Sequence, residues 1–154
     1  MPRHLHVLIL AAVTMLLVGC AVVGEAPVGS GPLVTVTTRG GECFEGPCGS
    51  SIVIERDGTV HDVAKPPNEF GTVPPDLLSA LDAAVKTTDF AVVRAVPFTG
   101  ECPVNYDGQE TIYEFGAPGG LERVASCETE IDPAHPAFAA TTAALQAVGV
   151  LPTP

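Results

Sequence analysis

Basic side chains are scarce in this 154-residue chain. Seven Lys and Arg stand against eighteen Asp and Glu, and the formal net charge is −11. Nucleic acids and anionic lipid head groups attract proteins through clustered Lys and Arg, so neither is expected as a partner of the folded part. The acidity itself is typical of a solvated surface that keeps a protein soluble.

Several motifs that carry chemistry are also missing. Ser50 and Ser51 lack the Gly-x-Ser-x-Gly turn that exposes a nucleophile. The Gly-rich residues 116–120 join two predicted strands and open no helix, as a phosphate-binding loop would. His61 and Asp62 are neighbours on a predicted strand, so their side chains point to opposite faces and cannot form a base with its orienting acid. We therefore predict a non-enzyme without cofactors.

The N-terminus carries a short apolar run over residues 7–18, preceded by Arg3 and followed by Gly19 and Cys20. The run is too short to span a bilayer, and a basic residue before it with a small residue after it is typical of a secretory leader. The residues Leu17-Val18-Gly19-Cys20 resemble the lipobox of bacterial lipoproteins.

This resemblance implies that the leader is cut before Cys20 and that the Cys20 thiol carries a diacylglyceryl group. Acyl chains such as palmitate contribute about 0.8 kcal/mol per buried methylene, and two or more form a stable anchor. The alternative is an ordinary leader that leaves Cys20 as a free thiol. The lipobox instead implies a cell-membrane protein, lipid-anchored on the extracytoplasmic face.

The chain thus divides into residues 1–19 as signal peptide, 20–32 as lipidated Cys20 with a Gly/Pro-rich tether, and 33–151 as one domain. Four cysteines remain in that domain, and an oxidising compartment predicts two disulfides. Three pairings are possible, and the spacing favours Cys43 with Cys48 and Cys102 with Cys127. The spacings do not fit a redox motif or a zinc site.

Alternation and turn signals predict an α+β fold. We expect an antiparallel sheet of about five to six strands built from two hairpins, with two helices packed on one face and two disulfides. Asp57-Gly58 marks the first hairpin and residues 116–120 mark the second. The predicted elements run as three strands followed by a helix, and this order occurs two times along the chain, which suggests a loose internal duplication. The predicted strands are residues 33–38, 51–55, 60–64, 90–96, 109–115 and 121–127, and the predicted helices begin at Pro75 and at Pro136, the second running to about residue 148.

Two sets of residues are candidates for binding. A ring closed by Cys43 and Cys48 would present Phe44 and Glu45 in a preorganised loop, and Tyr106 could extend that surface. A plain structural staple is the alternative.

The second set is Glu128, Glu130 and Asp132, which alternate and would project to one side of an extended chain. Such oxygens suit calcium, but the spacing is not that of an EF-hand, and a charged strand edge explains the same pattern. We therefore predict no metal site, with these three as weak candidates.

The region after residue 33 is similar to small bacterial envelope lipoproteins in its Cys43-to-Cys48 loop, its Asp57-Gly58 hairpin and its Cys102-Pro103 pair. That resemblance brings no activity with it. We predict a membrane-anchored, non-catalytic binding or accessory module, with an envelope protein as a candidate partner. The alternatives are a protein inhibitor that presents the Cys43-to-Cys48 loop, and a divalent-cation or small-molecule binder that uses the acidic residues.

Overall fold

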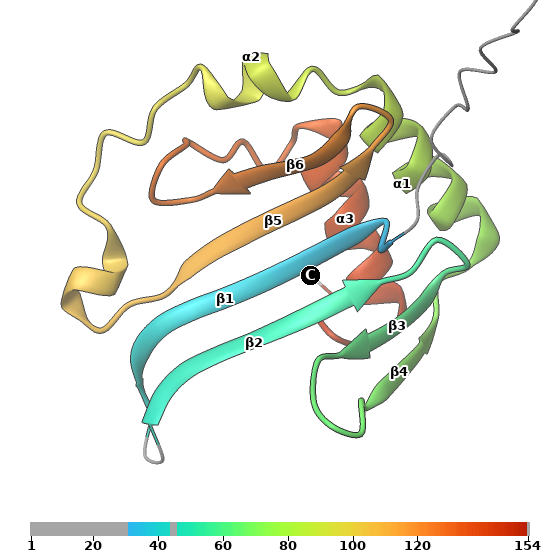
Figure 1. Cartoon of the computed structure of the whole chain (residues 1–154), viewed down its shortest axis with the longest axis horizontal. Helices are drawn as coiled ribbons and strands as arrows, with labels where there is room; N and C mark the ends of the chain where they lie inside the picture. The colour runs from blue at the N-terminus through green and yellow to red at the C-terminus, as the bar shows by residue number, and fades with distance from the viewer. Residues whose placement is uncertain (1–30, 44–45, 154) are drawn as a thin grey trace, which may run out of the picture.

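A computed structural model describes residues 31–43 and 46–153 (Figure 1). The predictions for Cys20, Phe44, Glu45 and most of the tether concern residues outside these ranges. The described elements, in chain order, are β1 (Val34–Cys43), β2 (Gly46–Ile54), β3 (Thr59–Asp62), β4 (Glu69–Thr72), α1 (Pro75–Thr87), α2 (Phe90–Arg94), the 3-10 helix η1 (Pro103–Tyr106), β5 (Glu110–Ala117), β6 (Gly120–Ala125) and α3 (Pro136–Ala147).

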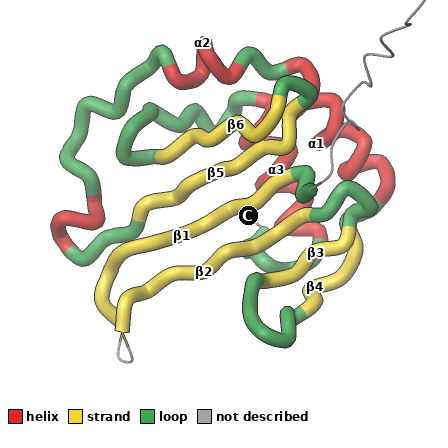
Figure 2. Tube along the Cα trace, in the orientation of Figure 1, coloured by secondary structure: helices red, strands yellow, loops and turns green. Residues whose placement is uncertain are grey.

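The six strands form one antiparallel sheet in the order β4-β3-β2-β1-β5-β6. Helices α1 and α3 lie together behind this sheet, and no other long helix of residues 31–43 and 46–153 covers its opposite face (Figures 1 and 2). The predicted α+β class, the sheet and the two disulfides are confirmed. No helix in the described ranges is long and apolar enough to cross a membrane.

The core lies between the sheet and the two helices. Val34 of β1 pairs with Ile54 on one side and Phe115 on the other, and all three are buried. The Phe115 ring packs against Phe90, with ring centroids 4.9 Å apart, and against Phe138 of α3. Burying several aromatic rings together supplies much of the stability of a small domain.

The predicted hairpin at Asp57-Gly58 is confirmed. Gly58 has φ +90°, which glycine adopts without strain, and the Asp57 carboxylate accepts a hydrogen bond from the Thr59 N–H at 2.9 Å. The two predicted helices are also confirmed, each with proline at its first position. Gly149, with φ +74°, follows the end of α3, as expected from its position.

Residues 90–96 were expected to form a strand, and this prediction is wrong. They begin with the short helix α2, because the Asp89 carboxylate caps it by accepting hydrogen bonds from the N–H groups of Ala91 and Val92, at 3.0 and 3.2 Å. The expected duplication also fails among the described residues. Strand β4 precedes α1 where a loop was expected, and only β5 and β6 precede α3.

Strand β1 was expected to end near residue 38 and instead continues to Cys43. Gly40 and Gly41 have φ of +90° and +78° and produce a bulge rather than a stop, with a register shift between Arg39 and Glu42. The pairing of β1 with β5 ends at Arg39, but its pairing with β2 continues. The last part of β1 and the first part of β2 therefore form a two-stranded ribbon beyond the sheet (Figure 1).

Candidate functional site

A cleft of about 440 Å³ lies between the sheet and the C-terminal end of α3. Strands β2, β1 and β5 form its floor. Its walls come from α3, from residues 149–151 and from Phe70 of β4. This volume falls within the roughly 300–1,000 Å³ that small-molecule sites occupy. We call this space the β1 cleft.

The floor of the β1 cleft continues the core outward in rows that run across three strands. Each row takes one residue from β2, one from β1 and one from β5, and all of them project toward the helices because positions two apart on a strand share a face. The row nearest the core is apolar and buried, the next is partly buried, and the outermost carries hydroxyl groups. From the core outward, the rows are Ile54, Val34 and Phe115, then Ile52, Val36 and Tyr113, then Ser50, Thr38 and Thr111.

The outermost row, Ser50, Thr38 and Thr111, is called the hydroxyl row below. Within it, the Thr38 and Ser50 hydroxyl oxygens lie 3.0 Å apart, and the Ser50 N–H also donates to the Thr38 hydroxyl at 3.2 Å. Burial raises the pKa of Tyr113, so its phenol is neutral and can donate a hydrogen bond at neutral pH. Every side chain that lines the β1 cleft is uncharged.

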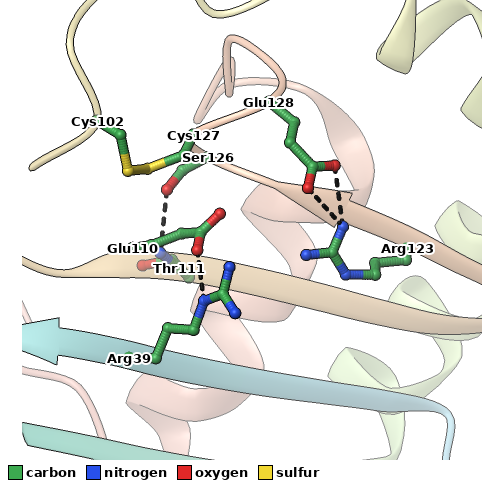
Figure 3. The surroundings of a disulfide bond; sticks show 8 residues. All are labelled: Arg39, Cys102, Glu110, Thr111, Arg123, Ser126, Cys127 and Glu128. Atoms are coloured by element: carbon green, nitrogen blue, oxygen red, sulfur yellow. Dashed lines mark hydrogen bonds and ion pairs between the residues drawn. A yellow bond between two sulfur atoms is a disulfide. The ribbon is translucent and has the colours of Figure 1, made fainter. Parts of the chain in front are cut away.

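Both predicted disulfide pairings are confirmed. Cys43 and Cys48 join β1 to β2 at the end of the ribbon, with Cα atoms 5.2 Å apart. Cys102 and Cys127 link the segment before η1 to the turn after β6, with Cα atoms 5.1 Å apart (Figure 3). Neither pair lines the β1 cleft.

An ion pair between Arg39 and Glu110 lies near the second disulfide (Figure 3). These two residues are paired next to Thr38 and Thr111, so they lie on the opposite face of the sheet from the β1 cleft. Glu110 exposes only 2% of its side chain and accepts a hydrogen bond from Arg39 Nε at 2.6 Å, whereas Arg39 is 60% exposed. The next residue, Thr111, donates its N–H to the Ser126 hydroxyl at 3.0 Å. These contacts tie β5 to β1 and to the turn after β6, so this group is structural.

The acidic candidates do not act together. The Glu128 carboxylate binds Arg123 at 2.9 Å, whereas Glu130 and Asp132 border a separate hollow beside α2. No group of three or more His, Cys, Asp or Glu side chains suited to a metal ion is found in residues 31–43 and 46–153. Tyr106 lies on η1, 64% exposed, and a hydrogen bond with Glu101 raises the pKa of its phenol.

His61 and Asp62 do not form a base and its orienting acid. His61 Nδ1 lies 2.7 Å from the backbone oxygen of Asp62, and its Nε2 lies 3.1 Å from the Glu55 carboxylate. These two contacts raise the pKa of His61, with the backbone contact the larger cause. The Asp62 carboxylate instead accepts hydrogen bonds from Asn68, which lower its pKa.

The residues of the β1 cleft were missed at the sequence level, although a signal existed. In all three floor strands, the positions in phase with the core change from large apolar residues to hydroxyl residues. Strand β1 shows this change at Thr38 and β2 shows it at Ser50. Polar residues at core-facing positions are unusual unless that part of the strand is left uncovered.

Comparison of the chain with protein-family models, with curated proteins and with solved structures gives no match, so its function has to be inferred from its own side chains.

Proposed function

We propose that this protein is a lipoprotein, anchored to the cell membrane on its extracytoplasmic face, whose domain binds a ligand without transforming it. One observation carries the binding part of this proposal. The β1 cleft has the volume of a small-molecule site, and it joins an apolar floor to a small number of grouped hydroxyls.

The chemistry of the lining favours binding over catalysis. Serine and threonine hydroxyls become nucleophiles only beside a base such as histidine. The two histidines of the described ranges, His61 and His135, do not line the β1 cleft. Ser50 has the Thr38 hydroxyl as its side-chain neighbour, and a second hydroxyl is no base. These groups can orient a ligand through hydrogen bonds.

The anchoring part of the proposal rests on the lipobox at Cys20. Growth of the native host with an alkyne-bearing fatty acid should label the wild-type protein, which should fractionate with the membrane. The Cys20→Ala variant should be unlabelled. A wild-type protein that takes up no label, or a Cys20→Ala protein that is labelled as strongly as the wild type, would contradict lipid anchoring at Cys20.

The binding part is tested by native mass spectrometry of the Cys20→Ala protein purified from its own host. We expect a co-purified small molecule of constant mass. Thr142→Phe, which places a ring in the β1 cleft, should abolish it, whereas Ala139→Phe, on the exposed side of the same helix, should retain it. If no molecule is retained by the wild type, or if both variants retain it, the β1 cleft is not the binding site.

A second candidate function is protein binding by the Cys43–Cys48 ring. The ribbon formed by the ends of β1 and β2 carries this ring beyond the rest of the sheet, where a partner could reach it (Figure 1). In-cell crosslinking of the tagged protein should then capture one envelope protein, and Phe44→Ala with Glu45→Ala should abolish that capture. Capture that persists in this double variant would exclude the ring as the binding surface.

A further inference from the structure

The β1 cleft exists because the helical layer is shorter than the sheet that it covers. Over the innermost row the helices seal the core, so Val34, Ile54 and Phe115 are buried. Over the two outer rows the cover is incomplete. Phe138 of α3 packs on Tyr113, and the space that remains is bordered by Thr141, Thr142 and Leu145 of α3, by residues 149–151 and by Phe70 of β4. The outer rows are therefore the open end of the hydrophobic core.

The floor offers side chains but no free backbone groups. Strand β1 is paired on both sides, with β2 and with β5, and β2 is also paired with β3. A peptide that adds a strand needs an unpaired sheet edge for its backbone hydrogen bonds. The edge strand β4 contributes only Phe70 to the lining. The β1 cleft therefore does not suit an extended peptide.

The lack of charge in the lining narrows the class of ligand that the β1 cleft suits. The whole chain has a net charge of −11, yet no charged side chain lines the β1 cleft. A carboxylate or ammonium group on the apolar floor would lose its water without gaining an ionic partner, which is costly, and at the more exposed hydroxyl row it would find no opposite charge either. The hydroxyl row can satisfy a neutral hydroxyl or carbonyl, because each of its side chains both donates and accepts.

We propose that the β1 cleft binds an uncharged amphiphile. Its aliphatic part lies on Val36, Ile52 and Leu145, and its hydroxyl or carbonyl group bonds to the hydroxyl row. This inference rests on the proposed function and deepens it by naming the ligand class. The Tyr113 phenol, at the boundary between the apolar floor and the hydroxyl row, supplies a further donor.

The test uses three probes with the same eight-carbon chain and different head groups. Monooctanoylglycerol is neutral, octanoate is anionic and octylammonium is cationic. Each is titrated into the exported chain carrying Cys20→Ala, below its micelle-forming concentration, and followed by isothermal titration calorimetry. We expect the neutral probe to bind at one site per chain. The affinity of both charged probes should be lower by a factor of roughly ten or more, because their charge finds no partner in the cleft.

The chain offers a matched pair of variants for this test. Thr38 and Thr37 are neighbours on β1, and each hydroxyl bonds across to a serine of β2, Thr38 to Ser50 at 3.0 Å and Thr37 to Ser51 at 2.8 Å. Only Thr38 faces the β1 cleft. Thr38→Val should weaken binding of the neutral probe about fivefold, the effect of one lost hydrogen bond. Thr37→Val should leave the affinity unchanged.

The results separate the ligand class from the function. Neutral-probe binding that Thr142→Phe abolishes and Ala139→Phe preserves supports the inference. A charged probe that binds as tightly as the neutral one overturns it, as does a neutral probe that never saturates. If the probes fail while native mass spectrometry still finds a molecule displaced by Thr142→Phe, the ligand class is wrong and the binding function stands. If both experiments fail, both proposals fall.

Discussion

The two disulfides should contribute unequally to stability, because they close loops of very different length. Cys43 and Cys48 are 5 residues apart in the sequence, whereas Cys102 and Cys127 are 25 residues apart. A cross-link stabilises mainly by restricting the unfolded chain, and the effect grows with the logarithm of the loop length. This relation gives about 2 kcal/mol for the short ring and about 3.5 kcal/mol for the long loop.

Contacts in the folded state do not change which of the two disulfides contributes more to stability. Without the long-loop disulfide, residues 95–98 still contact the turn after β6, since Phe98 donates its N–H to the Glu128 oxygen and Pro97 bridges to Thr129. Without the short-ring disulfide, the β1–β2 pairing on both sides of the bulge remains. Native contacts thus survive in both cases, and the difference arises in the unfolded chain.

The measurement is urea unfolding of two double variants, Cys102→Ala with Cys127→Ala and Cys43→Ala with Cys48→Ala, followed by circular dichroism. Both are made in the Cys20→Ala background, so that no free thiol remains to exchange. Small domains are stable by only about 5–15 kcal/mol, so the loss of about 3.5 kcal/mol from the long loop is readily measured. Equal losses, or a larger loss from the short ring, would refute the loop-length reasoning.

Three further substitutions test the core, the half-buried ion pair of Arg39 with Glu110, and His61. Phe115→Ala removes a fully buried ring and should lower the free energy of unfolding by about 3–5 kcal/mol in urea titrations. Arg39→Ala leaves the Glu110 carboxylate buried without its partner. This substitution should lower the free energy of unfolding by about 2 kcal/mol, which lies between the values for exposed and for buried ion pairs, and the same urea titration measures the loss. The pKa of His61 is raised in the folded state. The free energy that its protonated ring adds to folding is therefore fully present below the pKa that His61 has in the unfolded chain, and is lost as the pH rises through the pKa that it has in the folded protein. His61→Gln should therefore cost about 0.5 kcal/mol at pH 5.5 and close to nothing at pH 8, because its partner Glu55 is partly exposed.

Two of these predictions have a control variant, and the third is checked by its pH dependence. Leu121 is 69% exposed, so Leu121→Ala should change stability by about 0.5 kcal/mol at most. Arg123 pairs with an exposed carboxylate, that of Glu128, so Arg123→Ala should cost less than about 1 kcal/mol. Arg39→Ala and Arg123→Ala with the same effect would contradict the role of burial. A His61→Gln effect independent of pH would contradict the role of protonation.

Much of the fold could be predicted because its signals are local. The turn at Asp57 and Gly58 and the helix starts at Pro75 and Pro136 each depend on a few adjacent residues. Helix α2 was missed because its valines favour a strand, while the deciding contribution is one capping carboxylate, that of Asp89.

The β1 cleft could not be predicted in the same way, because it depends on which strands are neighbours. Thr38 and Thr111 are far apart in the sequence and become adjacent only when β5 pairs with β1. No local pattern specifies that pairing. The disulfides could be predicted from spacing, but the ion pair of Arg39 with Glu110 shares the non-local origin of the β1 cleft.

The direction of β1 has a consequence for where the proposed anchor would lie relative to the β1 cleft. The strand begins at Val34, next to the first described residues, and ends at Cys43, which is about 30 Å away for ten residues of strand. The rows of the β1 cleft follow the same direction, from the sealed core beside Val34 to the hydroxyl row at Thr38. If the chain is held at Cys20, as we propose, the tether joins the domain at the sealed end of the β1 cleft, and the hydroxyl row lies at the other end of the cleft floor. The hydroxyls that would bind a ligand are thus set apart, along β1, from the point where the proposed anchor would hold the domain.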